Sequence, residues 1–260
     1  MKSGVAVQLA LMEDDEIASG PYAVTAVFYD REEGPAHENG LEGVLDAVPW
    51  LSDAEFAVVL EPSDLELQLG CQGAMNATVR FSGVSAHSAR PWLGENAITK
   101  AGEWIAEMHR RRPEPVQVAG LTFKELLSIT KAEGGIARNV IPALFELNVN
   151  YRFPPSLTLE QAEERLRAVC APADGIEIVD RAPAAPIPEG NVHLDRLMRV
   201  SGAARTAKQA WTDVARLARR GIGGVNYGPG ETALAHRVDE SVPIENLEIA
   251  FDALKALLTR

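Results

Sequence analysis

The sequence predicts an α/β domain interrupted by an inserted α+β domain. Two apolar runs, at residues 22–29 and 56–60, are typical of strands that are buried on both faces of a parallel sheet. From Asn76 the pattern changes to alternation of apolar and polar residues, which predicts a half-exposed strand in an antiparallel layer. The proline-rich stretch at residues 182–190 blocks helix and sheet alike, so we place a domain boundary there.

The elements follow in order along the chain. The first part is expected to hold a helix at 4–12, the strand at 22–29, a helix at 40–48 and the strand at 56–60. The inserted part is expected to hold the strand from 76, a helix at 95–110, strands at 126–131 and 144–153, a helix at 159–169 and a strand at 176–179. The last part is expected to hold helices at 194–202 and 214–220, a strand at 222–226 and a helix at 245–258. Residues 1–73 and 183–260 then form one domain, and residues 74–182 form the insertion.

Composition excludes several function classes. The chain has 25 Lys and Arg against 37 Asp and Glu, and its net charge of -12 opposes binding to nucleic acid. The longest apolar stretches are far shorter than the roughly 20 residues that span a bilayer, and the N-terminus lacks a secretory signal. Two cysteines are too few for a disulfide framework. We therefore expect a cytoplasmic protein that handles small molecules.

The carboxylate pair Glu32-Glu33 follows the first apolar strand, beside Asp30 and Arg31. Adjacent carboxylates repel each other unless a cation shares them. A metal ion would take one of them as a ligand and leave the other free for proton transfer, which is what a hydrolytic site requires. The alternative is a solvated acidic turn.

Two further residues are candidate metal ligands. Glu61 ends the second apolar strand, where Pro62 terminates strand pairing. His236 ends the turn-rich loop 227–236, and a neutral imidazole is a good zinc ligand, although a lone loop histidine is also a common surface residue. The remaining histidines, apart from His87, are His37, His109 and His193. No other candidate site residue is expected to converge on them, and we predict that they lie at the surface.

The inserted domain contributes two more candidates. His87 lies in a loop of small residues, 83–92, that allows a substrate to approach closely; alternatively it is a turn histidine packed on Trp92. Arg152 alternates with apolar residues on a strand and is suited to bidentate binding of a carboxylate, or else it is an arginine of the exposed face.

Taken together and in order, these motifs resemble the zinc-dependent succinyl-diaminopimelate desuccinylases, over the whole chain. The wider superfamily, which includes acetylornithine deacetylases, aminoacylases and glutamate carboxypeptidases, shares most of them. The motifs are Phe28-Tyr29-Asp30-Arg31-Glu32-Glu33, Leu60-Glu61-Pro62, Ser85-Ala86-His87-Ser88, Gly134-Gly135-Ile136-Ala137-Arg138-Asn139-Val140-Ile141-Pro142, Trp211-Thr212-Asp213 and Ala235-His236.

The resemblance implies a zinc-peptidase-like catalytic domain, an inserted dimerisation domain with an antiparallel sheet and two helices, and a role for each matched residue. Glu32 would be the general base and acid, Glu33 a ligand of one zinc together with His236, and Glu61 a ligand of the other; cobalt is an alternative metal. His87 would stabilise the oxyanion in the other subunit of a homodimer. The positions implied to hold the substrate are Asn139, Arg152 and Thr212.

The implied reaction is hydrolysis of N-succinyl-L,L-diaminopimelate to succinate and L,L-diaminopimelate, in lysine and diaminopimelate biosynthesis. Relatives carry a leading segment with a His-x-Asp motif and a bridging Asp directly before the Met-Lys-Ser-Gly that opens this chain. We therefore expect an incomplete metal site, from an internal start or a fragment. The alternatives are a deacylase of another acyl amino acid, such as acetylornithine, a carboxypeptidase-like enzyme, and an inactive dimerising protein.

Overall fold

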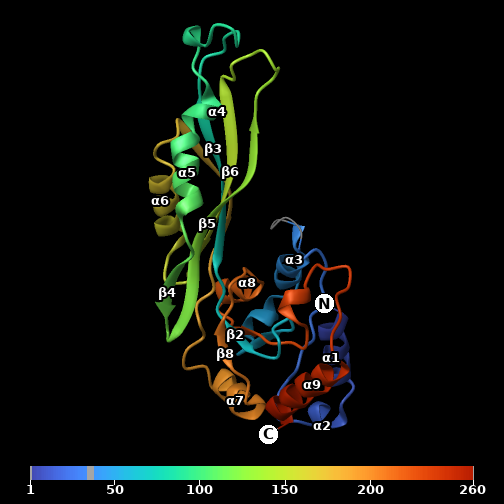
Figure 1. Ribbon diagram of the computed structural model, residues 1–260. Coiled ribbons are helices and arrows are strands. Elements are labelled where there is room, and N and C mark those ends of the chain that lie inside the picture. The colour runs from blue at the N-terminus through green and yellow to red at the C-terminus, as the bar shows by residue number, and fades with distance from the viewer. Residues whose placement is uncertain (1, 34–37, 260) are drawn as a thin grey trace. The chain divides into compact units, whose positions relative to one another are not determined.

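The chain divides into two compact units. The computed structural model describes residues 2–33 and 38–259. Unit 1 consists of Met1–Cys71 and Ala185–Arg260, and unit 2 consists of Gln72–Ala184 (Figure 1). No helix within the described residues combines the length and the apolar character needed to cross a bilayer.

Unit 1 is built on a four-stranded mixed sheet with the strand order β1-β9-β2-β8. The strands are β1 (Ala57–Val59), β2 (Leu67–Leu69), β8 (Arg205–Ala207) and β9 (Gly224–Asn226). Strand β9 runs parallel to β1 and antiparallel to β2, whereas β2 and β8 are parallel. The sheet is therefore not wholly parallel, and β2 and β8 are short strands that the sequence pattern did not predict.

Helices surround this sheet. They are α1 (Lys2–Met12), α2 (Asp15–Ala18), α3 (Gly40–Ala47), α7 (Val192–Ser201), α8 (Val214–Arg219) and α9 (Ile244–Thr259). Leu41 and Leu45 of α3 and Leu217 of α8 form a buried cluster that packs against Ala57 and Val59 of β1. Helix α9 packs on α1, α2 and α7. The helices predicted in this unit are confirmed, with ends shifted by a few residues.

The strand predicted at residues 22–29 is wrong. This segment has an irregular backbone in which half-buried residues are interspersed with exposed ones, and Phe28 is 50% exposed. Its apolar residues Val27 and Tyr29 are partly buried against the α3 cluster. An apolar segment forms a β-strand only where its backbone hydrogen-bonds to a neighbouring strand, and apolar composition alone does not supply that partner. The strand predicted at 56–60 is present as β1, but it is half-buried.

Unit 2 is a five-stranded antiparallel sheet with the order β4-β5-β6-β3-β7. The strands are β3 (Gly73–Ser82), β4 (Glu114–Val118), β5 (Leu121–Gly134), β6 (Leu144–Phe153) and β7 (Gly175–Ala182). In β3 the side chains of Ala77, Val79 and Phe81 are buried, whereas the residues between them are not. The alternation predicted from Asn76 is thus confirmed; β4 was not predicted.

Helices cover one face of this sheet, as Figure 1 shows for α5 (Gly102–Arg110) and α6 (Leu159–Val169). Trp104 of α5 and Leu166 of α6 join the buried core formed with β3 and β6. The single helix predicted at 95–110 is divided into α4 (Ala97–Lys100) and α5, and the exposed Gly102 directly after the break lowers helix propensity there.

Candidate active site

The carboxylates predicted to perform the chemistry lie together in unit 1. Glu32 follows the irregular segment in a turn, and Glu61 follows β1. Burial, followed by the charges of Glu61, Glu33 and Asp213, raises the pKa of Glu32 to about 7. Burial also raises the pKa of Glu61, and the charge of Glu33 adds to this effect. Like charges this close favour the protonated form unless a cation is present, so the cluster is suited to a cation or to proton transfer.

His236 approaches this cluster from the far end of the chain. Its Nε2 lies 3.3 Å from Oε1 of Glu33, with both side chains largely exposed. His236 has a φ of 64°, which is a left-handed conformation that non-glycine residues rarely adopt. The structure therefore brings the predicted ligands Glu33 and His236 together.

The loop that carries His236 is anchored beside Glu61. The hydroxyl of Ser63 accepts a hydrogen bond from the Gly228 amide at 2.9 Å and donates one to the Gly228 carbonyl at 3.2 Å. A Cβ at Gly228 would lie 2.4 Å from the carbonyl oxygen of Glu61, so only glycine permits this close approach without movement. The end of β1 and the loop after β9 are thus fixed against each other.

Two charged residues of this region were not predicted. Lys208 is only 6% exposed. Burial lowers the pKa of its ammonium group, and the charges of Glu61, Cys71 and Glu32 oppose that shift. Asp213 is 1% exposed and accepts hydrogen bonds from Tyr29, Asn39 and Arg216. Apart from its charge, nothing in the sequence around either residue indicates a role in the site. Asp213 does belong to the Trp211-Thr212-Asp213 motif, in which only Thr212 was predicted to be a site residue.

Thr212 lies beside them, 3% exposed. Its Oγ1 is buried and makes no hydrogen bond with any described residue. Its carbonyl oxygen is 3.8 Å from Sγ of Cys71, a buried free thiol whose pKa burial raises to about 11. A buried hydroxyl without a partner is available to another polar group.

The remaining predicted residues belong to unit 2. His87 is exposed, and its Nδ1 accepts a hydrogen bond from the Ala89 amide at 3.0 Å. The neighbouring Ser88 amide donates to the Asn139 carbonyl at 2.9 Å, so His87 and Asn139 lie in adjacent loops. Arg152 lies near the other end of β6, and its Nε donates to Oδ1 of Asn150 at 3.0 Å. At ~3.4 Å per residue, the eight residue-to-residue steps of β6 from Leu144 to Arg152 span about 27 Å, so unit 2 separates Arg152 from His87.

The histidines that were predicted to lie at the surface have different outcomes. His109 is exposed, as predicted, whereas His37 lies outside the described residues. The prediction for His193 is wrong, because its side chain is 15% exposed and lies 2.9 Å from a carboxylate oxygen of Glu55. It also packs edge-on against Tyr22, with ring centroids 5.5 Å apart.

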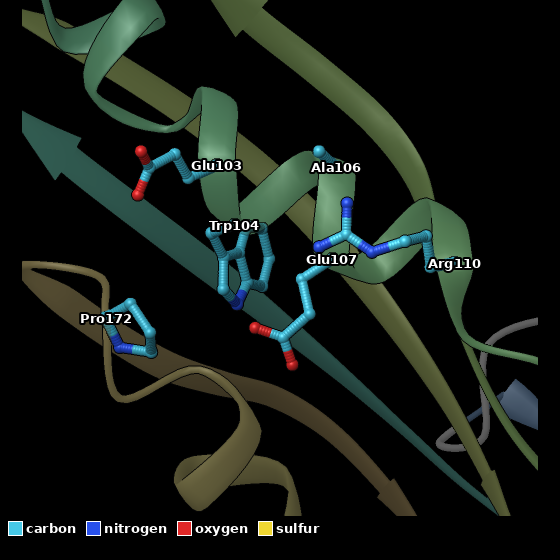
Figure 2. A pocket seen from close by; sticks show the side chains of 6 residues that line it. All are labelled: Glu103, Trp104, Ala106, Glu107, Arg110 and Pro172. Carbon is cyan, nitrogen blue, oxygen red and sulfur yellow. The ribbon is translucent and has the colours of Figure 1, made fainter.

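A surface cavity of about 400 Å³ lies elsewhere, on unit 2. Figure 2 shows that its lining comes from one side of α5 and from Pro172, beyond α6. Trp104 is one of the lining residues, and its Nε1 donates to the Val169 carbonyl at 2.9 Å. None of the predicted site residues lines this cavity.

The cluster formed by Glu32, Glu33, Glu61 and His236 offers donor atoms of the kind that zinc binds. Carboxylates and imidazole are zinc ligands. Burial raises the pKa of Glu32 and of Glu61, and neighbouring carboxylates add to this effect while Lys208 opposes it. Within residues 2–33 and 38–259, however, no three His, Cys, Asp or Glu side chains are grouped closely enough to hold one metal ion.

Comparison with known proteins gives the family. Residues 69–176 match the family model described as the peptidase dimerisation domain of the M20 type. The putative succinyl-diaminopimelate desuccinylase DapE of Mycobacterium tuberculosis is 39% identical over 260 residues, which cover 99% of this chain and 73% of that protein. The succinyl-diaminopimelate desuccinylase of Corynebacterium glutamicum is 36% identical over 269 residues, which cover 100% of this chain and 72% of that protein.

A solved structure shows the same fold at lower identity. A tripeptidase of Staphylococcus aureus matches with a TM-score of 0.73 and 21% identity, over 99% of this chain and 69% of that one. The predicted fold class is thereby confirmed. From the sequence relatives, the chain belongs to the succinyl-diaminopimelate desuccinylase family of hydrolases.

Proposed function

We propose that this protein hydrolyses the succinyl amide of N-succinyl-L,L-diaminopimelate, releasing succinate and L,L-diaminopimelate. The observation that carries the proposal is the juxtaposition, in unit 1, of Glu32, whose pKa is raised to about 7, with the Glu33–His236 pair. A carboxyl group that titrates near neutral pH is suited both to accept and to donate a proton. Two relatives that are 39% and 36% identical to this chain over the aligned residues are named as desuccinylases of this substrate.

Glu32 is the residue that moves the proton in this proposal. It accepts a proton from the attacking water and returns it to the nitrogen of the leaving amine as the amide bond breaks. Its half-buried position beside Glu61 favours this cycle, because neither its charged nor its neutral form is strongly preferred near pH 7.

Zinc is the proposed cofactor, with Glu33 and His236 as ligands of one ion and Glu61 as a ligand of a second. Bound zinc supplies Lewis-acid polarisation of the amide carbonyl and lowers the pKa of water. The chemistry of the donors supports this assignment, and the exposure of Glu33 and His236 leaves their side chains accessible to an ion from solution.

The substrate carries two amino-acid carboxylates and a succinyl carboxylate, so it requires cationic and polar contacts. We assign Arg152 to a carboxylate, because guanidinium binds carboxylates in bidentate fashion. Asn139 and Thr212 are assigned to polar groups of the substrate; the buried Oγ1 of Thr212, which has no partner within the described residues, supports this role. We further propose that residues 74–182 dimerise the chain and that His87 stabilises the oxyanion of the partner subunit.

The test is a substrate panel with the purified protein after zinc is added. Succinate release from N-succinyl-L,L-diaminopimelate is compared with acetate release from acetylornithine. We expect desuccinylation to be preferred and the Glu32→Gln variant to lower kcat by about 10²–10⁴-fold, the usual contribution of general acid–base catalysis. The Glu38→Gln variant serves as the control, because Glu38 is an exposed carboxylate in the same part of the chain. Preference for acetylornithine, or full activity of Glu32→Gln, would overturn the proposal.

A further inference from the structure

The carboxylate of Asp213 holds both sides of the chain segment that carries Glu32 and Glu33. Its Oδ2 accepts a hydrogen bond from the Tyr29 hydroxyl at 2.7 Å. The Asn39 side-chain amide donates to Oδ1 at 3.2 Å and to Oδ2 at 3.1 Å. Tyr29 precedes the glutamate pair and Asn39 follows it. We propose that Asp213 is a positioning residue that fixes Glu32 and Glu33 in place for the reaction. This inference rests on the proposed function of that pair.

Other contacts bring the two sides of the segment together at the same point. The Gly40 amide donates to the Asp30 carbonyl at 3.0 Å, and a Cβ at Gly40 would lie 2.8 Å from Oδ1 of Asp30. Asn39 is also the N-cap of α3, because its Oδ1 accepts the Leu41 amide at 2.9 Å. Asn39 therefore connects the start of α3 to Asp213. The packed helix α3 thus restricts the position of the segment that carries Glu32 and Glu33.

Asp213 itself is held rigidly. It is 1% exposed, and Nε of Arg216 donates to its Oδ1 at 2.8 Å. The Arg216 guanidinium lies over the Trp211 ring, 5.2 Å from its centroid. A buried carboxylate is tolerated only when charge and hydrogen bonds compensate its lost hydration, and here three side chains provide them. The anchor therefore has few alternative positions.

The part of this network that joins helices meets the part that holds the glutamate segment at Arg216, which bonds both to Asp213 and to Glu42. Glu42 of α3 pairs with Arg216 at 3.3 Å and with Arg220 at 2.9 Å, which connects α3 to α8 without Tyr29. Tyr29 and Asn39 each donate their own hydrogen bonds to Asp213, so a substitution at one residue removes its contact and leaves the other in place. A purely structural role would be sensitive to loss of the Glu42 pairs, whereas a positioning role would be sensitive to loss of the Tyr29 and Asn39 contacts.

The experiment uses Tyr29→Phe, Asn39→Ser and their combination. Phenylalanine keeps the ring and loses only the hydroxyl. Serine remains a good N-cap for α3, so Asn39→Ser removes the Asp213 contact and keeps the cap. Glu42→Gln is the matched control, because it weakens the α3–α8 ion pairs and leaves Tyr29 and Asn39 intact.

The first readout is hydrogen exchange of the Gly40 amide, whose bond to the Asp30 carbonyl joins the two sides of the segment, measured on metal-free protein in peptides that contain Gly40. We expect exchange to be at least ~10-fold faster in the double variant, with α1 and α9 unchanged, and unaltered in Glu42→Gln. The second readout is kinetic: kcat falls by about 10–100-fold in the double variant while KM stays within ~3-fold, because small misplacement of a reacting group slows the chemical step.

The outcomes separate this inference from the proposed function. If Glu32→Gln is inactive but the double variant exchanges and turns over like the parent, Asp213 does not position the pair. If Glu42→Gln matches the double variant in both readouts, the network is only structural and the inference is overturned. If Glu32→Gln keeps full activity, the proposed function fails, while the exchange measurement still decides whether Asp213 fixes the segment.

Discussion

Oε1 of Glu33 lies 3.3 Å from Nε2 of His236, although the two residues come from opposite ends of the chain. Their side chains are 72% and 73% exposed. An ion pair this exposed contributes little to stability, because water screens it and ordering two side chains costs entropy. The strained backbone of His236 is also a cost rather than a gain. This ion pair is therefore not a source of fold stability, which agrees with the zinc-ligand role proposed for the two residues.

Loss of either side chain is therefore expected to weaken zinc binding strongly. His236→Ala and Glu33→Ala each remove a proposed ligand, and we expect each to weaken zinc affinity by more than ~100-fold, since loss of groups that merely orient ligands costs roughly 10–100-fold. Titration of metal-free protein by calorimetry measures this. His109→Ala, an exposed histidine of unit 2, should bind zinc like the parent. Unchanged affinity in both ligand variants would refute the assignment.

Action of His87 in the partner subunit predicts complementation between two inactive variants. Co-expression of Glu32→Gln and His87→Ala with different tags yields mixed dimers in which one site has both residues. If each subunit contributes one site, purified mixed dimers should recover about half of the parent's activity, and a random mixture about a quarter. Each variant alone should be nearly inactive. Mixed dimers no more active than the single variants would show that His87 acts within its own subunit, or not at all.

Regular elements with strong local signals were predictable from sequence, whereas irregular ones were not. The prediction for α6 matches at both ends because a capping box fixes its start, with Thr158 and Gln161 bonded to each other's backbone. The prediction for β6 matches because its alternation spans the whole strand. The three-residue strands β2 and β8 are too short for any period to appear. The apolar composition before Asp30 predicts a strand that the structure lacks, since composition does not reveal whether a pairing partner exists.

The candidate site was predictable only as a set of separate residues. Glu33 and His236 are candidates by residue type and position, the family resemblance assigns them to one zinc, and the structure brings them together. The hydrogen bonds from Tyr29 and Asn39 to Asp213 span more than 170 residues of chain, and no local pattern encodes contacts over such a distance. Lys208 was missed for the same reason, because burial of a lysine follows from tertiary packing.

Adding one methyl group at Gly73 is expected to destabilise unit 2. A Cβ there would lie 2.0–2.6 Å from atoms of the Phe153 ring, which is fully buried and paired in register with Gly73. Overpacking of this kind costs about 1–3 kcal/mol of unfolding free energy. Gly43→Ala is the control of opposite sign, because Gly43 is exposed within α3 with no atom near its Cβ position, and alanine there should add ~0.5–1 kcal/mol. Urea unfolding measures both; equal stability of Gly73→Ala and the parent would contradict the packing argument.

Stability should depend on the ionisation of Asp14 in acid. Asp14 caps α2 and accepts a hydrogen bond from Nζ of Lys255 on α9 at 2.7 Å. The bond to Lys255 lowers the pKa of Asp14 below its usual value of 3.8, and the same bond raises the pKa of Lys255. Because the carboxyl binds its proton less readily in the folded state, its contribution to stability is complete above the unfolded-state pKa and is lost as the pH falls through the lower, folded-state value.

Replacing Asp14 by asparagine would keep the cap of α2 and remove the charge. The Asp14→Asn variant should therefore unfold at lower urea concentration than the parent at about pH 7, and the difference should shrink toward zero as the pH falls to about 2. Lys255→Gln provides the control, because in that background Asp14→Asn should have a smaller effect that depends less on pH; only the backbone hydrogen bonds from Glu16 and Ile17 then hold the carboxylate. A difference between parent and Asp14→Asn that stays constant across the acid range would mean that the Asp14–Lys255 pair does not connect α2 to α9 in solution.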